Sequence, residues 1–161
     1  MLTTAGACKA SSLEAAGSAV PKFKYITEPV FDYRVYTLRK FLNKYSSPLT
    51  PYSSEFIAMA DYYGIDYRMV PAITGVESTF GKQIPAGSYN AYGWANGKYS
   101  FTSWPNSIQI VTKTIKLKYI DKGAVSIGKI AKIYAPPSDT WGSKVQYFVS
   151  KIDTLPMSFD I

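Results

Sequence analysis

The stretch PAITGVESTFGKQIPAGSYNAYGW, residues 71–94, decides the expected fold because it joins a helical pattern to an aromatic loop. The helix is expected to begin after Asp66, a good N-cap residue, and to end before Gly81. Three apolar residues at helical spacing mark its inner side: Val70, Ile73 and Val76. Glu77 is the only acidic residue of the stretch, and the next one along the chain is Asp121.

Apolar residues recur at helical spacing on both sides of this stretch. They predict further helices over residues 30–45, 54–63, 104–122, 126–134 and 139–152, each bounded by Gly, Pro or a capping side chain. The segment AYGWANGKYSF carries aromatic residues on either side of Asn96-Gly97, which is a favoured hairpin turn. The expected fold is therefore mainly α, with about six helices and a small β-hairpin inserted after the helix that carries Glu77.

Composition indicates one globular domain with a flexible start. The chain has 161 residues, of which 47% are hydrophobic and 18% charged. Residues 1–28 are rich in Ala, Ser and Gly without periodicity, so we expect a flexible arm or linker there and a folded domain over 29–161. No signal peptide is evident, and no segment is expected to cross a membrane.

The charge and the aromatic content favour a binding function but leave the ligand open. The net charge of +7 suits polyanionic partners, which include nucleic acid, an acidic membrane surface and an anionic cell-wall polymer. Aromatic residues make up 16% of the chain, with 14 Tyr. They indicate either a binding surface or a tyrosine-rich core.

Missing residue types exclude several chemistries. The chain has no His and a single cysteine, Cys8, so it cannot build a Ser-His-Asp triad, an imidazole zinc site or an internal disulfide. We therefore expect no metal and no cofactor. Carboxylates, Tyr, Lys, Ser, Thr and backbone amides remain as the groups that could carry chemistry.

Glu77 is the main candidate among these groups. It is four residues after Ile73 and seven after Val70, so it shares their inward side near the C-terminal end of the helix. The helix dipole and partial burial would both raise its pKa, and a carboxyl group protonated near neutral pH suits a general acid for glycosidic cleavage. The alternative is a solvated glutamate at a helix end, which is a common arrangement.

Three segments, in order, resemble a known family. VESTFGK (76–82) resembles the Glu-Ser-x-(Phe/Trp)-Gly-Lys motif of lysozyme-like peptidoglycan hydrolases. YNAYGW (89–94) and IYAPPSDTWGSKV (133–145) resemble two further segments of the bacterial N-acetylglucosaminidase family, which includes autolysin, flagellar muramidase-type and mannosyl-glycoprotein endo-β-N-acetylglucosaminidase-like domains. The resemblance covers residues 54–153 and implies a lysozyme-like α+β fold.

The resemblance also implies roles for individual residues. Glu77 matches the catalytic acid, and Tyr134 matches the tyrosine across the cleft from it. Ser78 matches the serine beside the acid, Asn90 matches the motif asparagine, and Gly93 matches a glycine that permits close approach. With no metal ligands implied, the catalytic residues would be Glu77 and Tyr134.

Other readings stay open for several of these positions. Tyr134 could instead be a core tyrosine at a helix end, and Asn90 could serve turn chemistry alone. Trp94 is either a substrate contact or a packing residue. Tyr92 and Tyr99 are either platforms for sugar rings or part of the hairpin surface.

The acid-free run after Glu77 implies a mechanism with one carboxylate. Most glycosidases use two, and none follows Glu77 before Asp121. Glu77 would act as acid and then as base, while the 2-acetamido oxygen or the 6-hydroxyl of the substrate attacks the anomeric carbon. We thus expect a monomeric, extracellular or envelope-associated enzyme that cleaves β-1,4 bonds in peptidoglycan. A non-catalytic sugar-binding module is the alternative, and a basic nucleic-acid binder is less favoured because the lysines are dispersed.

Overall fold

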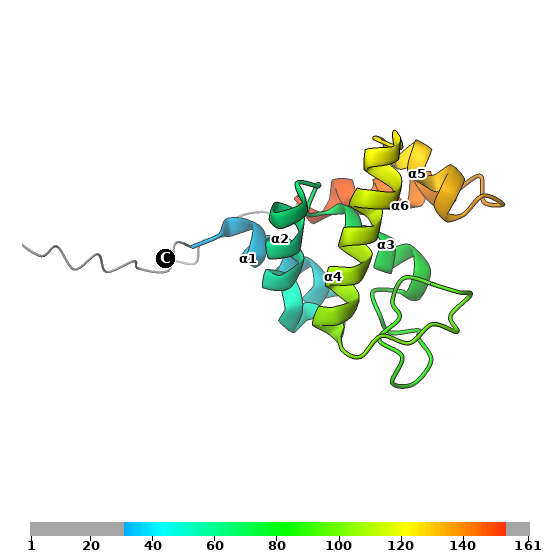
Figure 1. Cartoon of the computed structure of the whole chain (residues 1–161). Coiled ribbons are helices and arrows are strands. Elements are labelled where there is room, and N and C mark those ends of the chain that lie inside the picture. Colours follow the sequence, from blue (N-terminus) through cyan, green and yellow to red (C-terminus); the bar gives the residue numbers. More distant parts are fainter. Residues whose placement is uncertain (1–30, 154–161) are drawn as a thin grey trace, which may run out of the picture. The chain divides into compact units, whose positions relative to one another are not determined.

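The protein is mainly helical in the computed structural model, which describes residues 31–153 (Figure 1). The chain divides into two units, Met1–Val30 and Phe31–Ile161, and the arm expected over residues 1–28 lies outside the described residues. In chain order the elements are α1 (Tyr33–Lys44), η1 (Thr50–Tyr52), α2 (Ser53–Tyr63), α3 (Met69–Ser78), α4 (Trp104–Thr114), η2 (Ile115–Tyr119), η3 (Ile120–Lys122), α5 (Ile127–Tyr134) and α6 (Trp141–Ile152).

Local sequence signals place most helix ends. The side chains of Asp32, Ser103 and Ser126 accept backbone N–H groups at the starts of α1, α4 and α5. Gly64 ends α2 with a left-handed φ of 62°, and Gly123 ends the helical run after α4 with a φ of 97°. The mainly helical prediction is therefore confirmed, as are the predicted boundaries at Gly64, Ser103, Gly123 and Ser126.

Three helices begin later than the sequence predicts, the first being α1, which begins at Tyr33 rather than at residue 30. The predicted cap Asp66 accepts the backbone N–H of Arg68 at 2.9 Å, but this bond closes a turn, and α3 begins only at Met69. The last helix begins at Trp141, with Thr140 rather than Asp139 as its N-cap residue. Local side-chain bonds to the backbone compete with the first helical turn at such positions.

Helix packing forms one hydrophobic core. α2 packs against α4, α3 against α6, and α5 against α6. Each large apolar side chain buried in this way contributes about 1.5–3 kcal/mol before the entropy of ordering is counted. The largest fully buried apolar side chains come from all parts of the described chain: Leu38, Phe41, Leu42, Leu49, Phe56, Ile73, Phe80, Tyr92, Ile108, Ile115, Ile130 and Ile152.

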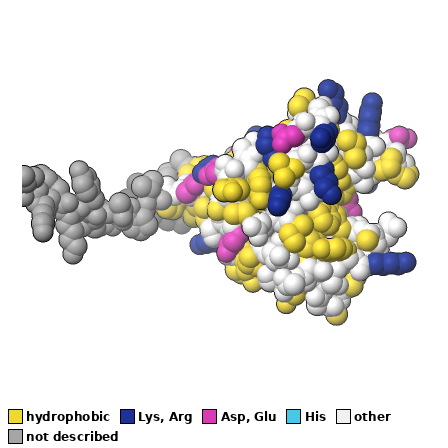
Figure 2. Space-filling view, viewed as in Figure 1, with side chains coloured by type: hydrophobic (Ala, Val, Ile, Leu, Met, Phe, Trp, Pro, Cys, Tyr) yellow, Lys and Arg dark blue, Asp and Glu magenta, His cyan; other side chains and the backbone are white. Residues whose placement is uncertain are grey.

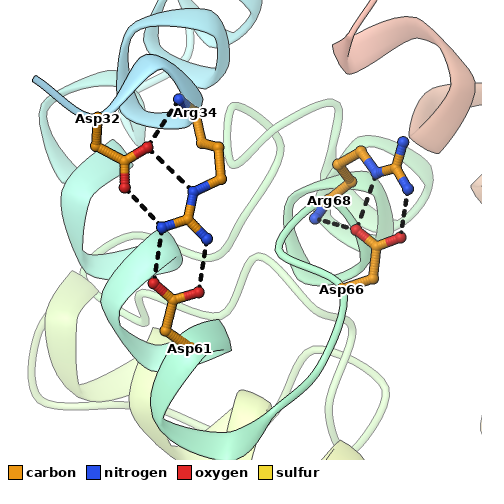
Figure 3. Close-up of polar contacts among 5 residues, drawn as sticks. All are labelled: Asp32, Arg34, Asp61, Asp66 and Arg68. Carbon is orange, nitrogen blue, oxygen red and sulfur yellow. Dashed lines mark hydrogen bonds and ion pairs between the residues drawn. The ribbon is translucent and has the colours of Figure 1, made fainter.

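Arginine 34 ties the start of α1 to α2. Its guanidinium contacts Asp32 at 2.7 Å and Asp61 at 2.7 Å, and each carboxylate receives two bonds (Figure 3). The pKa values of both carboxyl groups are lowered, mainly by these hydrogen bonds. Because the groups are partly exposed, each pair stabilises the fold by about 1 kcal/mol or less.

A second arginine, Arg68, joins the start of α3 to the end of α6. It binds Asp66 within the same turn, and it also reaches Asp153 just after α6 (Figure 3 shows the Asp66 contacts). The hydroxyl of Tyr67 donates to the same Asp153 carboxylate. These contacts engage both aspartates at one end of α3, far along the helix from Glu77.

The segment after α3 contains no β-strand among the described residues. The predicted β-hairpin is therefore not observed. Asn96 and Gly97 do adopt left-handed φ values of 54° and 81°, as a hairpin turn would. The Asn90 amide, however, donates to the carbonyls of Trp94 and Tyr99, both at 2.9 Å. The Trp94 carbonyl also accepts the backbone N–H groups of Gly97 and Tyr99, at 3.1 and 3.3 Å, so the segment folds as successive turns that the Asn90 side chain holds together.

Among the described residues, no helix combines the length and the apolar character that a membrane crossing requires.

Candidate active site

Glu77 lies in the last turn of α3 with its side chain half-buried. The indole N–H of Trp141, at the start of α6, donates a hydrogen bond of 2.6 Å to Oε1 of Glu77. Burial raises the pKa of Glu77 above its ordinary value, and the bond from Trp141 opposes this shift without reversing it. The neutral carboxyl group is therefore favoured more than in a solvated glutamate.

The turn after Glu77 is held in an unusual conformation. Thr79 and Phe80 both have positive φ, 53° and 59°, which costs a non-glycine residue about 1–2 kcal/mol. The buried Ser78 hydroxyl stabilises this turn, because it accepts the N–H of Gly81 at 2.9 Å and bonds the carbonyl of Ala91 at 2.8 Å. Ser78 thus fixes the end of α3 against the loop that follows.

The Phe80 side chain anchors the same turn in the core. Its ring packs edge-on against Phe41 and Phe148, with centroids 5.4 and 5.0 Å away. A Cβ at Gly75 would lie only 2.6 Å from the Phe80 ring, so the ring rests directly on the backbone of α3. This packing offsets the strained backbone and positions the last turn of the helix.

Gly93 brings the backbone of the loop against the Glu77 carboxyl group. Its φ is +70°, and a Cβ at this position would lie 2.3 Å from Oε2 of Glu77. That separation is far shorter than any contact a real side chain makes. Only glycine therefore lets the loop and the carboxyl group meet in this way.

Tyr134 completes the surroundings of Glu77 from the end of α5. Its ring stacks on Trp141 at 4.9 Å with an interplanar angle of 23°, and its hydroxyl donates to the Tyr92 carbonyl at 2.6 Å. Burial raises the pKa of Tyr134 well above its ordinary value, and the nearby charge of Glu77 raises it further. Tyr134 is therefore a neutral hydroxyl near neutral pH.

An open pocket of about 430 Å³ lies beside these residues, and we call it the aromatic pocket. Figure 2 shows hydrophobic side chains gathered beside α4 in the same view as Figure 1. Glu77 does not line the pocket but lies at its margin, because its carboxyl group is against Gly93 and close to Tyr134, which both line it. The lining residues are Gly93, Trp94, Ala95, Asn96, Thr114, Lys118, Tyr119 and Tyr134.

No acidic residue lines the aromatic pocket among the described residues. Asp121, the nearest acid in sequence after Glu77, pairs with Lys116 at 2.7 Å. Asp139 lines a second hollow of about 320 Å³, formed by α5 and α6, that shares no lining residue with the first. Within the described part of the chain, no carboxylate contributes to the pKa shift of Glu77.

The structure brings together some of the predicted site residues. Glu77, Gly93 and Tyr134 meet at the aromatic pocket, and Trp94 lines it. Tyr99 is 42% exposed, but it stands outside the pocket and packs edge-on against Trp94. A sugar-contacting role for Tyr99 therefore gains no support from the pocket.

Three predicted contact residues are buried instead. The Tyr92 side chain is 0% exposed, so its predicted role as a sugar platform is wrong, and only its carbonyl serves the site by binding Tyr134. The side chains of Ser78 and Asn90 are also buried, and they form hydrogen bonds with backbone carbonyls. These two residues shape the site rather than line it.

Sequence reasoning missed the site roles of Trp141, Lys118 and Tyr119. The apolar pattern of α6 places Trp141 in the core, and nothing in the local sequence indicates that its N–H meets a carboxyl group 64 residues earlier. Lys118 and Tyr119 lie in η2, a π-helical turn that directly continues α4. Such turns occur frequently at functional sites, but the sequence predicts an uninterrupted helix here.

Among residues 31–153, no group of three or more His, Cys, Asp or Glu side chains could hold a metal ion. Comparison with protein-family models and with curated proteins finds no match for this chain.

Proposed function

We propose that this protein cleaves β-1,4 glycosidic bonds in the glycan strands of peptidoglycan, with Glu77 as its single general acid and base. The observation that carries the proposal is the Glu77 carboxyl group, half-buried, with a raised pKa, at the margin of an aromatic pocket. The three family-like segments support it, because they contain Glu77, Gly93 and Tyr134. A lysozyme-like fold is part of the same proposal.

The hydrogen bond from Trp141 assigns the two oxygens of the carboxyl group different tasks. Oε1 accepts the indole N–H, so the acidic proton belongs on Oε2, which faces Gly93 at the pocket. Glu77 donates this proton to the glycosidic oxygen as the bond to the anomeric carbon breaks. The departing sugar leaves as an alcohol, and Glu77 becomes a carboxylate.

The positive charge on the remaining sugar is then met by the substrate itself. Either the 2-acetamido oxygen attacks the anomeric carbon and gives an oxazolinium ion, or the 6-hydroxyl of muramic acid attacks and gives an anhydro sugar. In the first route Glu77 deprotonates the incoming water, and in the second it deprotonates the 6-hydroxyl. Both routes fit a pocket whose described lining contains no acid.

Tyr134 supports the first route, attack by the 2-acetamido oxygen, as a neutral group. Its hydroxyl donates a hydrogen bond to the Tyr92 carbonyl, so the hydroxyl oxygen can still accept a hydrogen bond beside Glu77. An acceptor there suits the N–H of an acetamido group and would orient it toward the anomeric carbon. Trp94 and Tyr119 add aromatic surface for sugar rings.

The remaining expectations follow from this substrate. A net charge of +7 suits an envelope whose polymers are anionic, and the attachment would weaken as salt rises. We propose an extracellular or envelope-associated monomer that needs no cofactor. Peptidoglycan strands are its main partner, and anionic wall polymers are a second.

A non-catalytic sugar-binding module on the same fold is the second candidate. Two observations favour it: no described acid lines the aromatic pocket, and Glu77 lies at the margin rather than in the lining. Such a module would bind glycan strands through Trp94 and Tyr119 and leave them intact. The release of fragments separates the two candidates.

Digestion of purified peptidoglycan, followed by mass analysis of the soluble fragments, tests the proposal. Fragments with a reducing end indicate the substrate-assisted hydrolytic route, and anhydro fragments indicate attack by the 6-hydroxyl. Reduction with borohydride before analysis distinguishes them, since only a reducing end gains two hydrogens. Binding without any soluble fragment would contradict the enzymatic proposal and favour the binding module.

A further inference from the structure

The aromatic pocket carries one charged side chain among its described lining residues, Lys118. The other groups of the lining are neutral, including Tyr119, whose pKa is raised by burial. Glu77 at the margin also favours its neutral form. The charge presented to a ligand in this pocket is therefore positive, and it comes from one side chain.

Lys118 differs from the neighbouring Lys116 in its contacts. Lys116, two residues earlier, forms an ion pair with Asp121 at 2.7 Å, and no ion pair joins Lys118 to any of the described residues. Both lysines lie in the π-helical turn η2, but only Lys118 and the adjoining Tyr119 line the pocket. A cation next to an aromatic ring thus faces the space beside Glu77.

This combination suits a ligand that carries a carboxylate on a sugar. The aromatic walls supply stacking surface, and an ammonium group supplies a charge-assisted hydrogen bond. A neutral glycan could use the walls but would leave the cation without a partner. Selectivity between the two ligands therefore depends on Lys118.

We propose that Lys118 makes the aromatic pocket selective for glycan strands that carry carboxylates over neutral strands of the same length. This inference rests on the proposed function, whose substrate contains both the lactyl carboxylate of muramic acid and the carboxylates of stem peptides. Lys118 binds such a carboxylate and holds the neighbouring sugar beside Glu77. It is a specificity-determining residue and takes no part in proton transfer.

Binding measurements with a Lys118→Gln variant test the inference. The ligands are a neutral chitin tetrasaccharide, peptide-free muramic-acid strands of equal length, and strands that keep their stem peptides. Titration calorimetry in the Glu77→Gln background prevents cleavage during the measurement. Lys113→Gln is the matched control, because it removes the same charge from the exposed side of α4 and does not line the pocket.

We expect Lys118→Gln to weaken binding of carboxylate-bearing strands by about 5- to 10-fold, as for one partly exposed charge-assisted contact. The chitin tetrasaccharide should bind both proteins equally, and Lys113→Gln should change neither affinity. A loss seen with peptide-free strands assigns the contact to the lactyl group. A loss confined to peptide-bearing strands assigns it to the stem peptide, and both results support the inference.

Equal weakening for the neutral and the acidic strands would overturn the inference, as would no change for any ligand. Failure of the parent protein to bind all three ligands would overturn it as well. Failure of the proposed function is a different result: strands would bind with the expected dependence on Lys118, but the protein with Glu77 intact would release no fragments.

Discussion

Replacement of Gly93 by alanine tests the close contact between the loop and the Glu77 carboxyl group. Two costs are expected at this position. Alanine at a φ of +70° costs about 1–2 kcal/mol because of the left-handed backbone. The new Cβ would also lie 2.3 Å from Oε2 of Glu77, so the carboxyl group must move and break its bond with Trp141.

Loss of that bond leaves the buried indole N–H without a partner, which costs about 1–3 kcal/mol. The total expected for Gly93→Ala is therefore about 2–5 kcal/mol in the free energy of unfolding. Gly87→Ala is the matched control. Gly87 has a φ of +69°, nearly the same as Gly93, and a Cβ there would meet nothing within 4 Å.

Urea unfolding followed by circular dichroism measures both variants, alone and in a Glu77→Ala background. We expect Gly93→Ala to cost about 1–3 kcal/mol more than Gly87→Ala when Glu77 is present. The two substitutions should cost the same once the carboxyl group is removed. An excess cost that persists without Glu77, or no excess cost at all, would refute the contact.

Three further substitutions test the surroundings of the carboxyl group. Trp141→Phe keeps the stack on Tyr134 but removes the N–H that lowers the pKa of Glu77. The alkaline limb of the kcat/KM–pH profile should therefore move to higher pH. An unmoved limb would count against the hydrogen bond between Trp141 and Glu77. The raised pKa of Glu77 means that its neutral form stabilises the fold below about pH 4.5 and that this stability is lost as the pH rises through the folded value. The Tm of Glu77→Gln relative to the parent should therefore be higher at pH 7 than at pH 4, and thermal melts that show the opposite trend would contradict burial as the cause. Asn90→Ala removes the hydrogen bonds to the carbonyls of Trp94 and Tyr99. It should lower the free energy of unfolding, measured in urea, by about 1–3 kcal/mol. A change below about 0.5 kcal/mol would show that the loop keeps its conformation without these bonds.

The helices could be predicted from the sequence because their signals are local. Caps such as Ser103 and Ser126, and a terminating glycine such as Gly64, act within a few residues of the helix end. The hairpin prediction rested on the Asn96-Gly97 turn and on the aromatic residues that flank it, and these local signals indicate a turn without specifying strand pairing. The side chain of Asn90, several residues earlier, binds the carbonyls of Trp94 and Tyr99, and the sequence pattern of the turn does not indicate these contacts.

The candidate site could be predicted only in part. Glu77 follows from the inward side of α3, and the burial that raises its pKa agrees with that reasoning. Trp141 and Lys118 reach the site through the packing of α6 and through the π-helical turn after α4, and both depend on tertiary structure. Tyr92 was assigned to the surface because aromatic loop residues can stack on sugars, but burial decided its place.

The initial rate at which the protein releases soluble glycan fragments from purified peptidoglycan, compared between Glu77→Gln and Glu55→Gln, tests the central claim most directly. Glu55 lies in the first turn of α2, and its one hydrogen bond within residues 31–153 comes from the neighbouring Ser54, so its variant controls for loss of a carboxylate. We expect Glu77→Gln to lower the rate by about 100- to 10,000-fold, as for a lost general acid, and Glu55→Gln to leave it unchanged. A folded Glu77→Gln protein that releases fragments at the parent rate would contradict the account.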